Sequence, residues 1–236
     1  MARALDDAAG ERLARWRAWA FPGGEEPARG VAAVEWEEEG ELRSSPRARW
    51  IPFRARHRLE ASRTTFRWDA LLGTRALTRT AVTDACDDGH GWSVAKAAGI
   101  LPVARLTGPE IDRGQVMRWL ADVARCPSAL LLHPGLEAAS AGGDGLRLRD
   151  AAGPAEAVVE VRLAPDGAPV AISGMRPGME GRRFVVRPWS GTMEAPLEWE
   201  GLRVPTRLEA AWEYPEGVVV TYRASSTPIR AVRRPG

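Results

Sequence analysis

Three aspartates and a histidine lie close together in the sequence and could form a metal site. Carboxylate and imidazole groups are common ligands of divalent ions, and the candidates are Asp84, Asp87, Asp88 and His90. Their spacing matches neither an EF-hand loop nor a zinc motif, and the dipeptide Asp88-Gly89 is typical of a β-turn. The sequence therefore predicts a turn between two strands, with no bound metal and no cofactor.

Nucleophilic catalysis requires a hydroxyl or thiol beside an oriented base, and the histidines are the candidate bases. His57 lies mid-strand among arginines, so we expect it at the surface or at the rim of a site. His133 precedes a proline at the end of a helix, where a capping role is expected. The sequence contains no Gly-x-Ser-x-Gly, His-Glu-x-x-His or phosphate-loop motif. A hydrolase that uses Asp84 or His90 is therefore an alternative without a motif behind it.

The two cysteines are too few for a disulfide framework. Cys86 and Cys126 both have apolar neighbours, so we expect buried free thiols. Such thiols are typical of the cytoplasm, which is the predicted location. No stretch of the sequence approaches the roughly 18 uninterrupted apolar residues of a membrane-spanning helix, and none is predicted.

Basic and acidic residues nearly balance and give a formal net charge of +2. This excess is too small to indicate nucleic-acid binding without a local basic patch. The arginines of residues 43–63 alternate with apolar residues, which is typical of the solvated face of a strand pair. The alternative is a protein-interaction module that presents this arginine-rich face to an acidic partner.

Arg118 and Asp122 are one helical turn apart and are expected to form an ion pair on one face of a helix. This helix is predicted to begin at a capping box over residues 107–110 and to run to about Arg125, followed by a short helix over residues 128–133. On the surface such a pair contributes only about 0.3 to 0.5 kcal/mol. In a helix that crosses a concave sheet, the pair would be partly buried and would hold the helix in place.

Aromatic side chains are the strongest candidates for ligand binding. Ten tryptophans are spread along the 236 residues, which indicates anchors distributed through a sheet. A curved sheet would turn several of them inward around an apolar cavity, whereas a densely packed core would leave no cavity. Together with Arg118 and Asp122, the predicted ligand-binding residues are Trp50, Phe53, Phe66, Trp68, Trp92, Trp119, Trp189 and Trp212.

These candidates are placed by strands that the alternation of apolar and polar residues predicts. Residues 47–73 are expected to form two long strands around a short polar turn at 61–63. Further strands are predicted over residues 76–86 and 91–97. The acidic run at residues 37–41 is predicted as a solvated hairpin tip.

The ends of the chain are predicted as helix and as strand, respectively. Apolar residues recur at helical spacing over residues 3–20, where we expect an amphipathic helix packed on the sheet. After the mid-chain helices, short strands joined by turns indicate an antiparallel meander. These strands are predicted over residues 146–149, 155–164, 170–175, 182–189, 192–200, 207–214 and 218–224, with turns at 165–167, 177–178 and 215–217.

Short motifs follow one another from residue 31 to residue 232. They are Trp50-x-Pro52-Phe53-x-Ala55, Phe66-x-Trp68-x-Ala70, Asp84 with Gly89-x-Gly91, the helix Arg118 to Asp122, Pro127-x-Ala129-Leu130, Arg176, Pro188-Trp189-x-Gly191, Gly201-x-x-x-Pro205, Trp212 and Tyr222. Their order resembles a bacterial family of uncharacterised proteins, a domain of unknown function. Cys86, Asp122 and Cys126 depart from the pattern of that family, so a pocket lined by these positions would have different contents here.

The resemblance implies a LolA-like half-barrel, a curved antiparallel sheet with helices across its concave side. We therefore predict an α+β protein with an N-terminal helix in residues 1–24 and one β-sheet domain in residues 25–236, which carries a helical insertion at about 108–133. The first functional hypothesis is a non-catalytic binder or carrier of an apolar or lipid-like small molecule between the sheet and the insertion. Fold alone does not establish function, so the interaction module and the hydrolase remain alternatives.

Overall fold

A single antiparallel sheet of 13 strands dominates the structure, in the order β6-β5-β4-β3-β2-β1-β13-β12-β11-β10-β9-β8-β7. The computed structural model describes residues 7–74, 79–181 and 183–233. The strands are β1 (Val31–Leu42), β2 (Ile51–Glu60), β3 (Phe66–Leu72), β4 (Thr80–Asp87), β5 (His90–Ala97), β6 (Leu101–Leu106), β7 (Leu136–Ser140), β8 (Gly145–Asp150), β9 (Val158–Leu163), β10 (Pro169–Glu180), β11 (Arg183–Trp199), β12 (Leu202–Tyr214) and β13 (Gly217–Arg233). The sheet thus consists of two meanders that meet where β1 pairs with β13.

The alternation of apolar and polar residues sets which face of each strand is buried. On β2, Phe53, Ala55 and Leu59 are buried, whereas Arg54 and Arg56 between them are exposed. The predicted pairing of residues 47–73 is confirmed, because β2 and β3 are antiparallel neighbours around a polar turn. The sheet therefore has one apolar concave face and one charged convex face.

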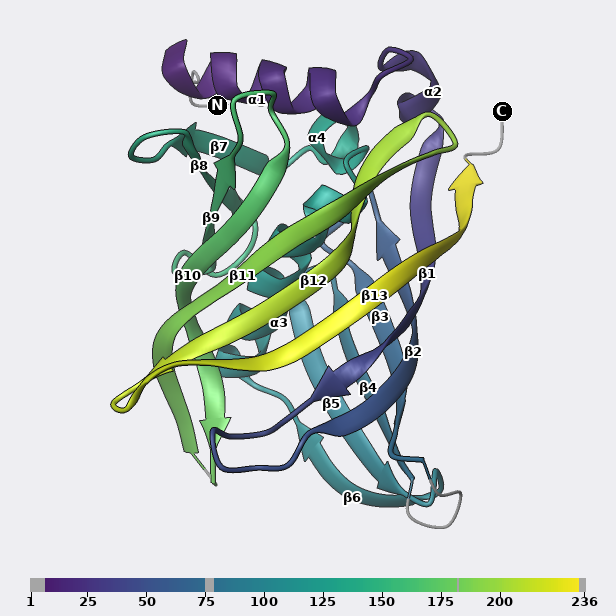
Figure 1. Cartoon of the computed structure of the whole chain (residues 1–236), viewed down its shortest axis with the longest axis vertical. Coiled ribbons are helices and arrows are strands. Elements are labelled where there is room, and N and C mark those ends of the chain that lie inside the picture. The colour runs from purple at the N-terminus through teal and green to yellow at the C-terminus, as the bar shows by residue number, and fades with distance from the viewer. Residues whose placement is uncertain (1–6, 75–78, 182, 234–236) are drawn as a thin grey trace.

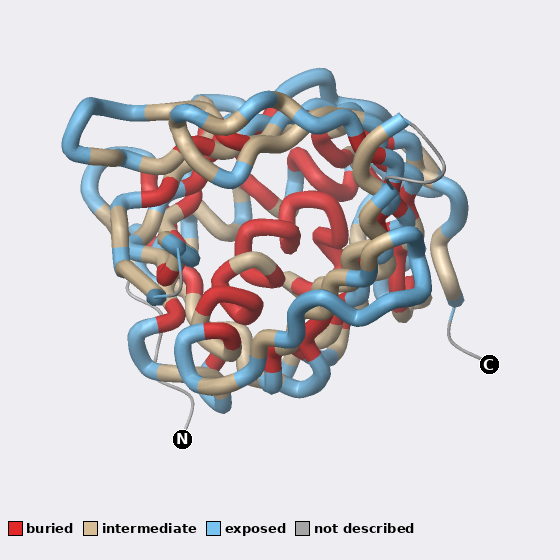
Figure 2. Tube along the Cα trace, turned by 90° about the horizontal axis from the view of Figure 1, so that it is seen from below, coloured by how far each residue is buried: buried red, intermediate tan, exposed pale blue. Residues whose placement is uncertain are grey.

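Helices join the two edges of the sheet and fill its concave side. Helix α3 (Pro109–Asp122), a 3-10 turn (Val123–Arg125) and α4 (Ala129–Leu132) connect the edge strands β6 and β7. Helix α3 contacts β4 and β5 on one side and β8, β9 and β10 on the other. In Figure 1 it runs inside the curve of the sheet, and in Figure 2 buried helical turns lie within the wall of strands. The predicted curved sheet with a mid-chain helical insertion is confirmed.

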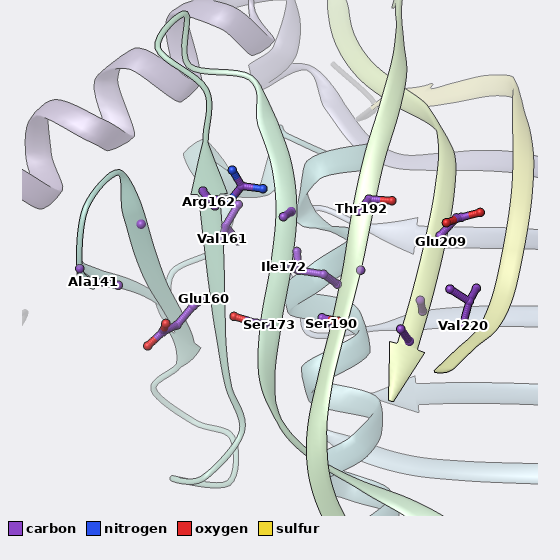
Figure 3. Close-up of a pocket in the computed structure, with 16 residues that line it drawn as sticks. Ala141, Glu160, Val161, Arg162, Ile172, Ser173, Ser190, Thr192, Glu209 and Val220 are labelled. Atoms are coloured by element: carbon purple, nitrogen blue, oxygen red, sulfur yellow. The ribbon is translucent and has the colours of Figure 1, made fainter. Parts of the chain in front are cut away.

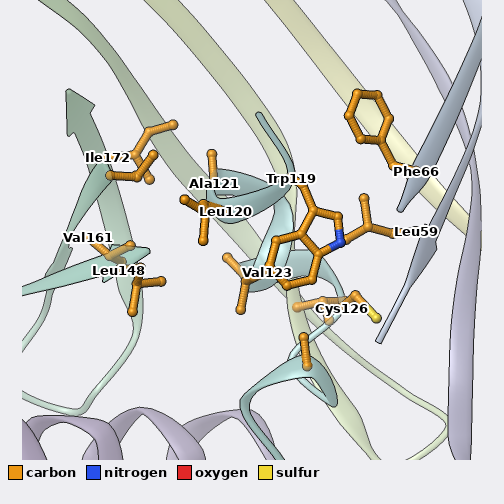
Figure 4. Close-up of a cluster of buried hydrophobic side chains, with 14 of the residues drawn as sticks. Leu59, Phe66, Trp119, Leu120, Ala121, Val123, Cys126, Leu148, Val161 and Ile172 are labelled. Atoms are coloured by element: carbon orange, nitrogen blue, oxygen red, sulfur yellow. The ribbon is translucent and has the colours of Figure 1, made fainter. Parts of the chain in front are cut away.

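The hydrophobic core lies between the insertion and the concave face. Trp119 of α3 is fully buried beside Leu59 and Phe66 of the sheet and Cys126 of the insertion (Figure 4). Burying a large indole removes much apolar surface from water, which stabilises the fold. The insertion is therefore an integral part of the core.

A second set of helices lies at one end of the sheet. Helix α1 (Asp7–Ala20) and the short α2 (Glu26–Arg29) precede β1, and α1 contacts β7, β8 and β12 (Figure 1). The N-terminal helix is thus confirmed from Asp7 onward, and residues 3–6 of that prediction lie outside the described residues. No helix in the described part of the chain has the length and apolar character needed to cross a membrane.

The acidic run at residues 37–41 is not a hairpin tip, contrary to the prediction. It continues β1, which pairs with β13 on one side and with β2 on the other. Glu37 and Glu39 tolerate this position because they face outward and form ion pairs with Arg56 and Arg54 of β2. Glu38 between them points into the concave face and is buried.

The C-terminal half of the sheet has longer strands than predicted. Residues 177–178 are not a turn but part of β10, where Gly178 makes room for the ring of Trp212; a Cβ there would lie 3.0 Å from that ring. The two strands predicted at 182–189 and 192–200 form a single strand, β11, because Ser190 and Gly191 stay paired with both neighbouring strands. The turns at 165–167 and 215–217 are confirmed.

Two smaller differences from the prediction concern the edge strands and the start of α3. The edge strands β6 and β7 were not predicted, because β6 is exposed at most positions and lacks an alternating pattern. The predicted capping box is absent, since α3 begins at the N-cap Gly108, whose φ of 113° suits glycine and which has no capping side chain. The predicted strand 76–86 is observed as β4, and residues 76–78 lie outside the described residues.

Candidate ligand-binding site

A pocket of about 300 Å³ lies on the concave face between the end of α3 and strands β3, β4 and β10 to β13. Its aromatic wall is formed by Trp68, Trp189, Trp212 and Tyr222. Aliphatic side chains complete the apolar lining, and charged groups gather where α3 meets the sheet: Asp84, Arg118, Asp122, Arg125 and Arg176. Most ligand sites combine an apolar lining with a few polar groups in this way.

One small residue lies in the sheet wall of the pocket. Ala210 of β12 lines the pocket, and its partner across the two strands is Gly191 of β11. The neighbouring inward pairs are large, with Trp189 opposite Trp212. A Cβ at Gly191 would lie 2.7 Å from a backbone oxygen, so the position accepts no larger residue. The register of β11 and β12 therefore places Ala210 in the pocket wall beside the large pair of Trp189 and Trp212.

Beneath the pocket, Glu38 is the centre of a buried polar network. Its Oε1 accepts a hydrogen bond from Arg125 Nη1, and its Oε2 accepts hydrogen bonds from Trp68 Nε1 at 2.8 Å and from the Tyr222 hydroxyl at 3.0 Å. Burial raises the pKa of Glu38, but the charge of Arg125 and the hydrogen bonds outweigh it and hold that pKa well below its usual range. Glu38 is therefore ionised, and its oxygens are fully engaged.

Arg125 links Glu38 to the helical insertion. Its Nη2 donates to Asp122 Oδ1 at 2.7 Å, and its Nη1 donates to Ser226 Oγ at 3.1 Å. Nη1 also donates to Glu38 Oε1. Buried charges are tolerated when they are paired and hydrogen-bonded in this manner. The network ties the 3-10 turn after α3 to the central strands β1 and β13.

His57 belongs to the same network and is fully buried, so the prediction of a surface or rim position was wrong. Its Nδ1 lies 2.8 Å from Arg125 Nη2, which is a donor, and its Nε2 lies 3.8 Å from Asp122 Oδ2. The same Nδ1 lies 3.3 Å from Glu38 Oε1, so it contacts both members of the Glu38 and Arg125 ion pair. Burial and the nearby Arg125 charge lower the pKa of His57 below its ordinary value.

Arg118 forms the second polar contact between α3 and the sheet. Its Nη1 donates to Asp84 Oδ2 at 2.9 Å, and its guanidinium lies 4.8 Å from the centre of the Trp68 ring. The predicted pair with Asp122 is present at 3.9 Å between Nε and Oδ2, and both side chains are largely buried. Arg118 therefore lies between two carboxylates and an aromatic surface.

Arg176 of β10 occupies the opposite side of the pocket. Its guanidinium carbon lies 4.7 Å from the centre of the Trp189 ring and 5.9 Å from that of Trp212. Its Nε donates to the carbonyl oxygen of Gly114 on α3 at 3.1 Å. Burial and the positive charge of Arg118 lower the pKa of Arg176 to about 10, so it is still charged at neutral pH.

The chain matches the family of unknown function DUF6544 over residues 14–224. It belongs to DUF6544. None of the curated proteins matches its sequence.

Among solved structures, a LolA superfamily protein from Nitrosomonas europaea is similar with a TM-score of 0.50, at 12% identity over 96% of this chain and 94% of that chain. A DUF1329 family protein from Desulfovibrio piger is similar with a TM-score of 0.51, at 8% identity over 94% of this chain and 92% of that chain. The DUF6544 chain therefore has a LolA-like fold, and the predicted resemblance to an uncharacterised family with this half-barrel is confirmed.

Five of the predicted ligand-binding residues lie at the pocket of this DUF6544 protein: Trp68, Arg118, Asp122, Trp189 and Trp212. Phe53 lies directly behind this wall, with its ring 5.4 Å from Tyr222 and 5.5 Å from Trp68. Phe66 and Trp119 are buried in the core and do not line the pocket. These eight positions share the concave side because they alternate with outward-facing residues or project from the insertion.

Two predicted residues lie away from the pocket. Trp50 precedes β2 and is held between the guanidinium groups of Arg43 and Arg223, at 4.7 Å and 4.6 Å from its ring centre. Trp92 of β5 packs against Arg67, an outward residue of β3. Trp92 is one position along β5 from the buried Gly91, so it faces the opposite side of the sheet, and Trp50 lies before β2 begins. The spacing of the tryptophans along the chain did not reveal either position.

Sequence reasoning missed the polar network, although the sequence held a signal for it. Glu38 continues the inward alternation of Val34 and Trp36, and His57 continues that of Phe53, Ala55 and Leu59. Arg125 had no comparable signal, because it lies in a 3-10 turn where the helical periodicity of α3 ends. Only the three-dimensional register brings these three residues together.

The candidate metal ligands of the DUF6544 protein are dispersed. Asp84 turns into the pocket and pairs with Arg118, whereas Asp88 pairs with Arg63 at the exposed turn. Among the described residues, no group of three metal-ligating side chains is found. His133 lies elsewhere, with Nε2 3.0 Å from Thr64 Oγ1 and Nδ1 accepting from the Gly135 amide at 3.1 Å, consistent with its expected place at the end of a helix.

The arginines of β2 are matched by acids on β1. Arg54 pairs with Glu39 at 3.1 Å, Arg56 with Glu37 at 3.6 Å, and Arg58 lies 2.7 Å from a glutamate of the same strand β1, Glu35. The face is therefore charged and solvated, as predicted for Arg54 and Arg56, but its charges alternate in sign. This pattern gives no excess of positive charge for an acidic partner.

The convex side carries a second pocket of about 430 Å³ across strands β8 to β13 (Figure 3). The surface is recessed where the outward side chains are short, as at Ser173, Ser190 and Ala211, and Glu160 and Glu209 border this depression. It is a shallow depression on the solvated face. The pocket on the concave side differs in having aromatic walls and buried charges.

Proposed function

We propose that this DUF6544 protein is a non-catalytic binder or carrier of an apolar or lipid-like small molecule, held on the concave face. The observation that carries the proposal is the pocket of about 300 Å³ with aromatic and aliphatic walls between α3 and the sheet. Exposed apolar surface of this kind is unfavourable in water and is relieved when an apolar molecule covers it.

The charged groups near the pocket support binding in preference to chemistry. Arg125 and Glu38 are hydrogen-bonded to each other, and His57 is enclosed between charged neighbours. The thiols of Cys86 and Cys126 are buried, which raises the pKa of each to about 12. A nucleophile and a base within reach of a common substrate position, which hydrolysis requires, are not brought together by these described residues.

Tryptophan fluorescence tests the proposal directly, because Trp68, Trp189 and Trp212 line the pocket. A fatty acid with a nitroxide on its chain is titrated into the full-length protein, and contact with the indoles quenches their emission. We expect saturable quenching that an unlabelled fatty acid reverses. Native mass spectrometry of protein purified from cells provides a second measurement, in which a co-purified small molecule is expected.

A pocket-filling variant identifies where the ligand binds. Ala210→Phe adds a ring to the wall of the pocket, and we expect it to weaken binding at least about tenfold, which is 1.4 kcal/mol. The matched control is Ser173→Phe, because Ser173 is exposed on the convex side of β10. Equal affinities of the two folded variants would contradict the proposal. If Ala210→Phe does not fold, Ala210→Leu repeats the test with a smaller side chain.

A further inference from the structure

Of the three arginines at the concave pocket, Arg176 alone forms no ion pair with a carboxylate among the described residues. Arg125 donates to Glu38, Asp122 and Ser226, and Arg118 is bonded to Asp84. Arg176 donates only its Nε, to a backbone carbonyl of α3 at 3.1 Å, and it forms no ion pair with a carboxylate in the described part of the chain. Both of its terminal nitrogens are therefore available to a ligand.

We propose that Arg176 binds the anionic head group of the ligand, so that the pocket takes a single-chain amphiphile ending in a carboxylate or a phosphate. This inference rests on the proposed binding function and specifies the chemical class of its ligand. The two terminal nitrogens of a guanidinium match a pair of oxygens on such a group and donate two parallel hydrogen bonds.

The tryptophans orient the guanidinium for this contact. Trp189 and Trp212 lie 4.7 Å and 5.9 Å from the Arg176 guanidinium carbon, which is the range of a cation-π contact. Contacts with ring faces and the Nε hydrogen bond to the Gly114 carbonyl restrict the plane of the group. Because this ordering is present before a ligand arrives, less conformational entropy is lost on binding.

The electrostatic surroundings also favour an anion at this position. Burial and then the charge of Arg118 lower the pKa of Arg176, and Asp84 and Asp122 raise it less than Arg118 lowers it. Both carboxylates pair with Arg118, and Asp122 also pairs with Arg125. An oxyanion beside Arg176 would neutralise a half-buried charge that pairs with no carboxylate among the described residues. A cationic head group would instead meet two arginines.

The volume of the pocket limits the size of the ligand's apolar part, and the pocket's lining indicates where that part lies. At about 300 Å³ the pocket is at the lower end of the roughly 300 to 1,000 Å³ found for small-molecule sites, which favours one alkyl chain over two. Ala210 is the small residue of the pocket wall next to the Trp189 and Trp212 pair. The alkyl chain is therefore expected to lie over Ala210, with its head group at Arg176.

The head-group inference is tested by isothermal titration calorimetry with four ligands of equal chain length: dodecanoate, dodecyl phosphate, dodecanol and dodecyltrimethylammonium. We expect the wild-type protein to bind each anionic ligand at least about tenfold more tightly than dodecanol, and the cationic ligand most weakly. Acetate and inorganic phosphate alone are included to distinguish a free anion from an amphiphile. Binding of the free anions as tight as that of the alkyl ligands would overturn the single-chain class.

Substitutions of Arg176 test whether this residue causes the preference for anionic head groups. Arg176→Gln should lower the affinity for the anions by a larger factor than the affinity for dodecanol and so remove the preference, and Arg176→Lys should retain only part of the preference. The matched control is Arg187→Gln, which removes a neighbouring charge that already pairs with Glu180 and should keep the preference.

The outcomes separate this inference from the proposed function. Equal binding of the anionic and neutral ligands by the wild type would overturn the role of Arg176 and leave the carrier function intact. Binding of none of the alkyl ligands would contradict both. Because the comparison of head groups uses the wild-type protein, the inference can be refuted even if an Arg176 variant does not fold.

Discussion

The carboxylate of Glu38 on β1 and the guanidinium of Arg125 after α3 form an ion pair from which solvent is excluded. The two residues come from β1, near the middle of the sheet, and from the insertion that fills its concave side. The pair therefore couples the position of the insertion to that of the strands beside the pocket. Loss of either partner leaves a buried charge without its counter-ion.

We predict that Arg125→Met lowers the free energy of unfolding by about 3 to 5 kcal/mol, the usual cost of removing one member of a buried pair. Glu38 would lose its main counter-ion, and its hydrogen bonds to Trp68 and Tyr222 would remain. Urea unfolding followed by tryptophan fluorescence measures the change.

The exposed pair of Arg56 and Glu37 provides the control for this prediction. Arg56→Met should change the free energy of unfolding by no more than about 1 kcal/mol, because both side chains are mostly in solvent. Adding Glu38→Gln to Arg125→Met should recover part of the loss. If Arg125→Met and Arg56→Met have the same effect, the network does not stabilise the fold as described.

How much the sequence revealed is clear from Glu38 and His57. The strands that carry them follow from alternation, and Phe53 and Trp68 beside them were correctly expected on the concave side. The charge of Glu38 and the arginines around His57 favoured a solvated position, because the energy of a buried polar group depends on its partners. Those partners come from α3 and the 3-10 turn, so local sequence could not indicate them.

We predict that His57 makes the protein less stable as the pH falls. Its pKa is lowered in the folded state, so the unfolded chain binds the proton more tightly. The stabilisation that the neutral ring contributes is present above the unfolded pKa of about 6.5 and is lost as the pH falls through the lower folded value. The free energy of unfolding, measured by urea at several values from about pH 8 to pH 5, should fall more steeply in the wild type than in His57→Asn.

His133 must be separated from His57 in this experiment, because burial also lowers its pKa. His133→Asn should keep the part of the pH dependence that His57 causes, and the double variant should have the smallest slope. Glu38 acts at lower pH, since its pKa lies well below that of a free glutamate. An unchanged slope in His57→Asn would show that its protonation is not linked to folding.

We predict opposite effects for two glycine-to-alanine substitutions. A Cβ at Gly40 would lie 2.1 Å from the carbonyl oxygen of Arg223 and 2.9 Å from the Cα of Ala224, and both belong to the neighbouring backbone. Gly40→Ala must therefore displace β13 from β1, and we expect a loss of about 1 to 3 kcal/mol or more.

Gly10→Ala is the matched comparison, because no atom lies within 4 Å of its Cβ position in helix α1. Alanine favours a helix over glycine by about 0.5 to 1 kcal/mol, so this variant should be slightly more stable. Thermal unfolding followed by circular dichroism distinguishes the two. A stable Gly40→Ala variant would mean that β1 and β13 are less closely spaced than the structure indicates.

The aromatic residues illustrate the second limit of sequence reasoning. Trp189 and Trp212 reach the pocket because they are partners in the register of β11 and β12. Trp92 belongs to an equally regular strand, but its register with β4 and β3 places it beside Arg67 on the convex side. Composition predicted a sheet with many aromatic anchors, whereas a shift of one residue decides which of them can contact a ligand.

We predict that both cysteines are protected from thiol reagents in the folded protein. Cys86 is 1% exposed and Cys126 is 0% exposed, and burial raises the pKa of each thiol to about 12. At about pH 8 only ~0.01% of such a thiol is ionised, whereas an unperturbed thiol is partly thiolate. Absorbance after addition of Ellman's reagent should show slow reaction of the native protein and rapid reaction of two thiols in guanidinium chloride. Because Cys126 lies in the insertion and Cys86 on β4, fast labelling of Cys126 alone would mean that the insertion opens from the sheet without global unfolding.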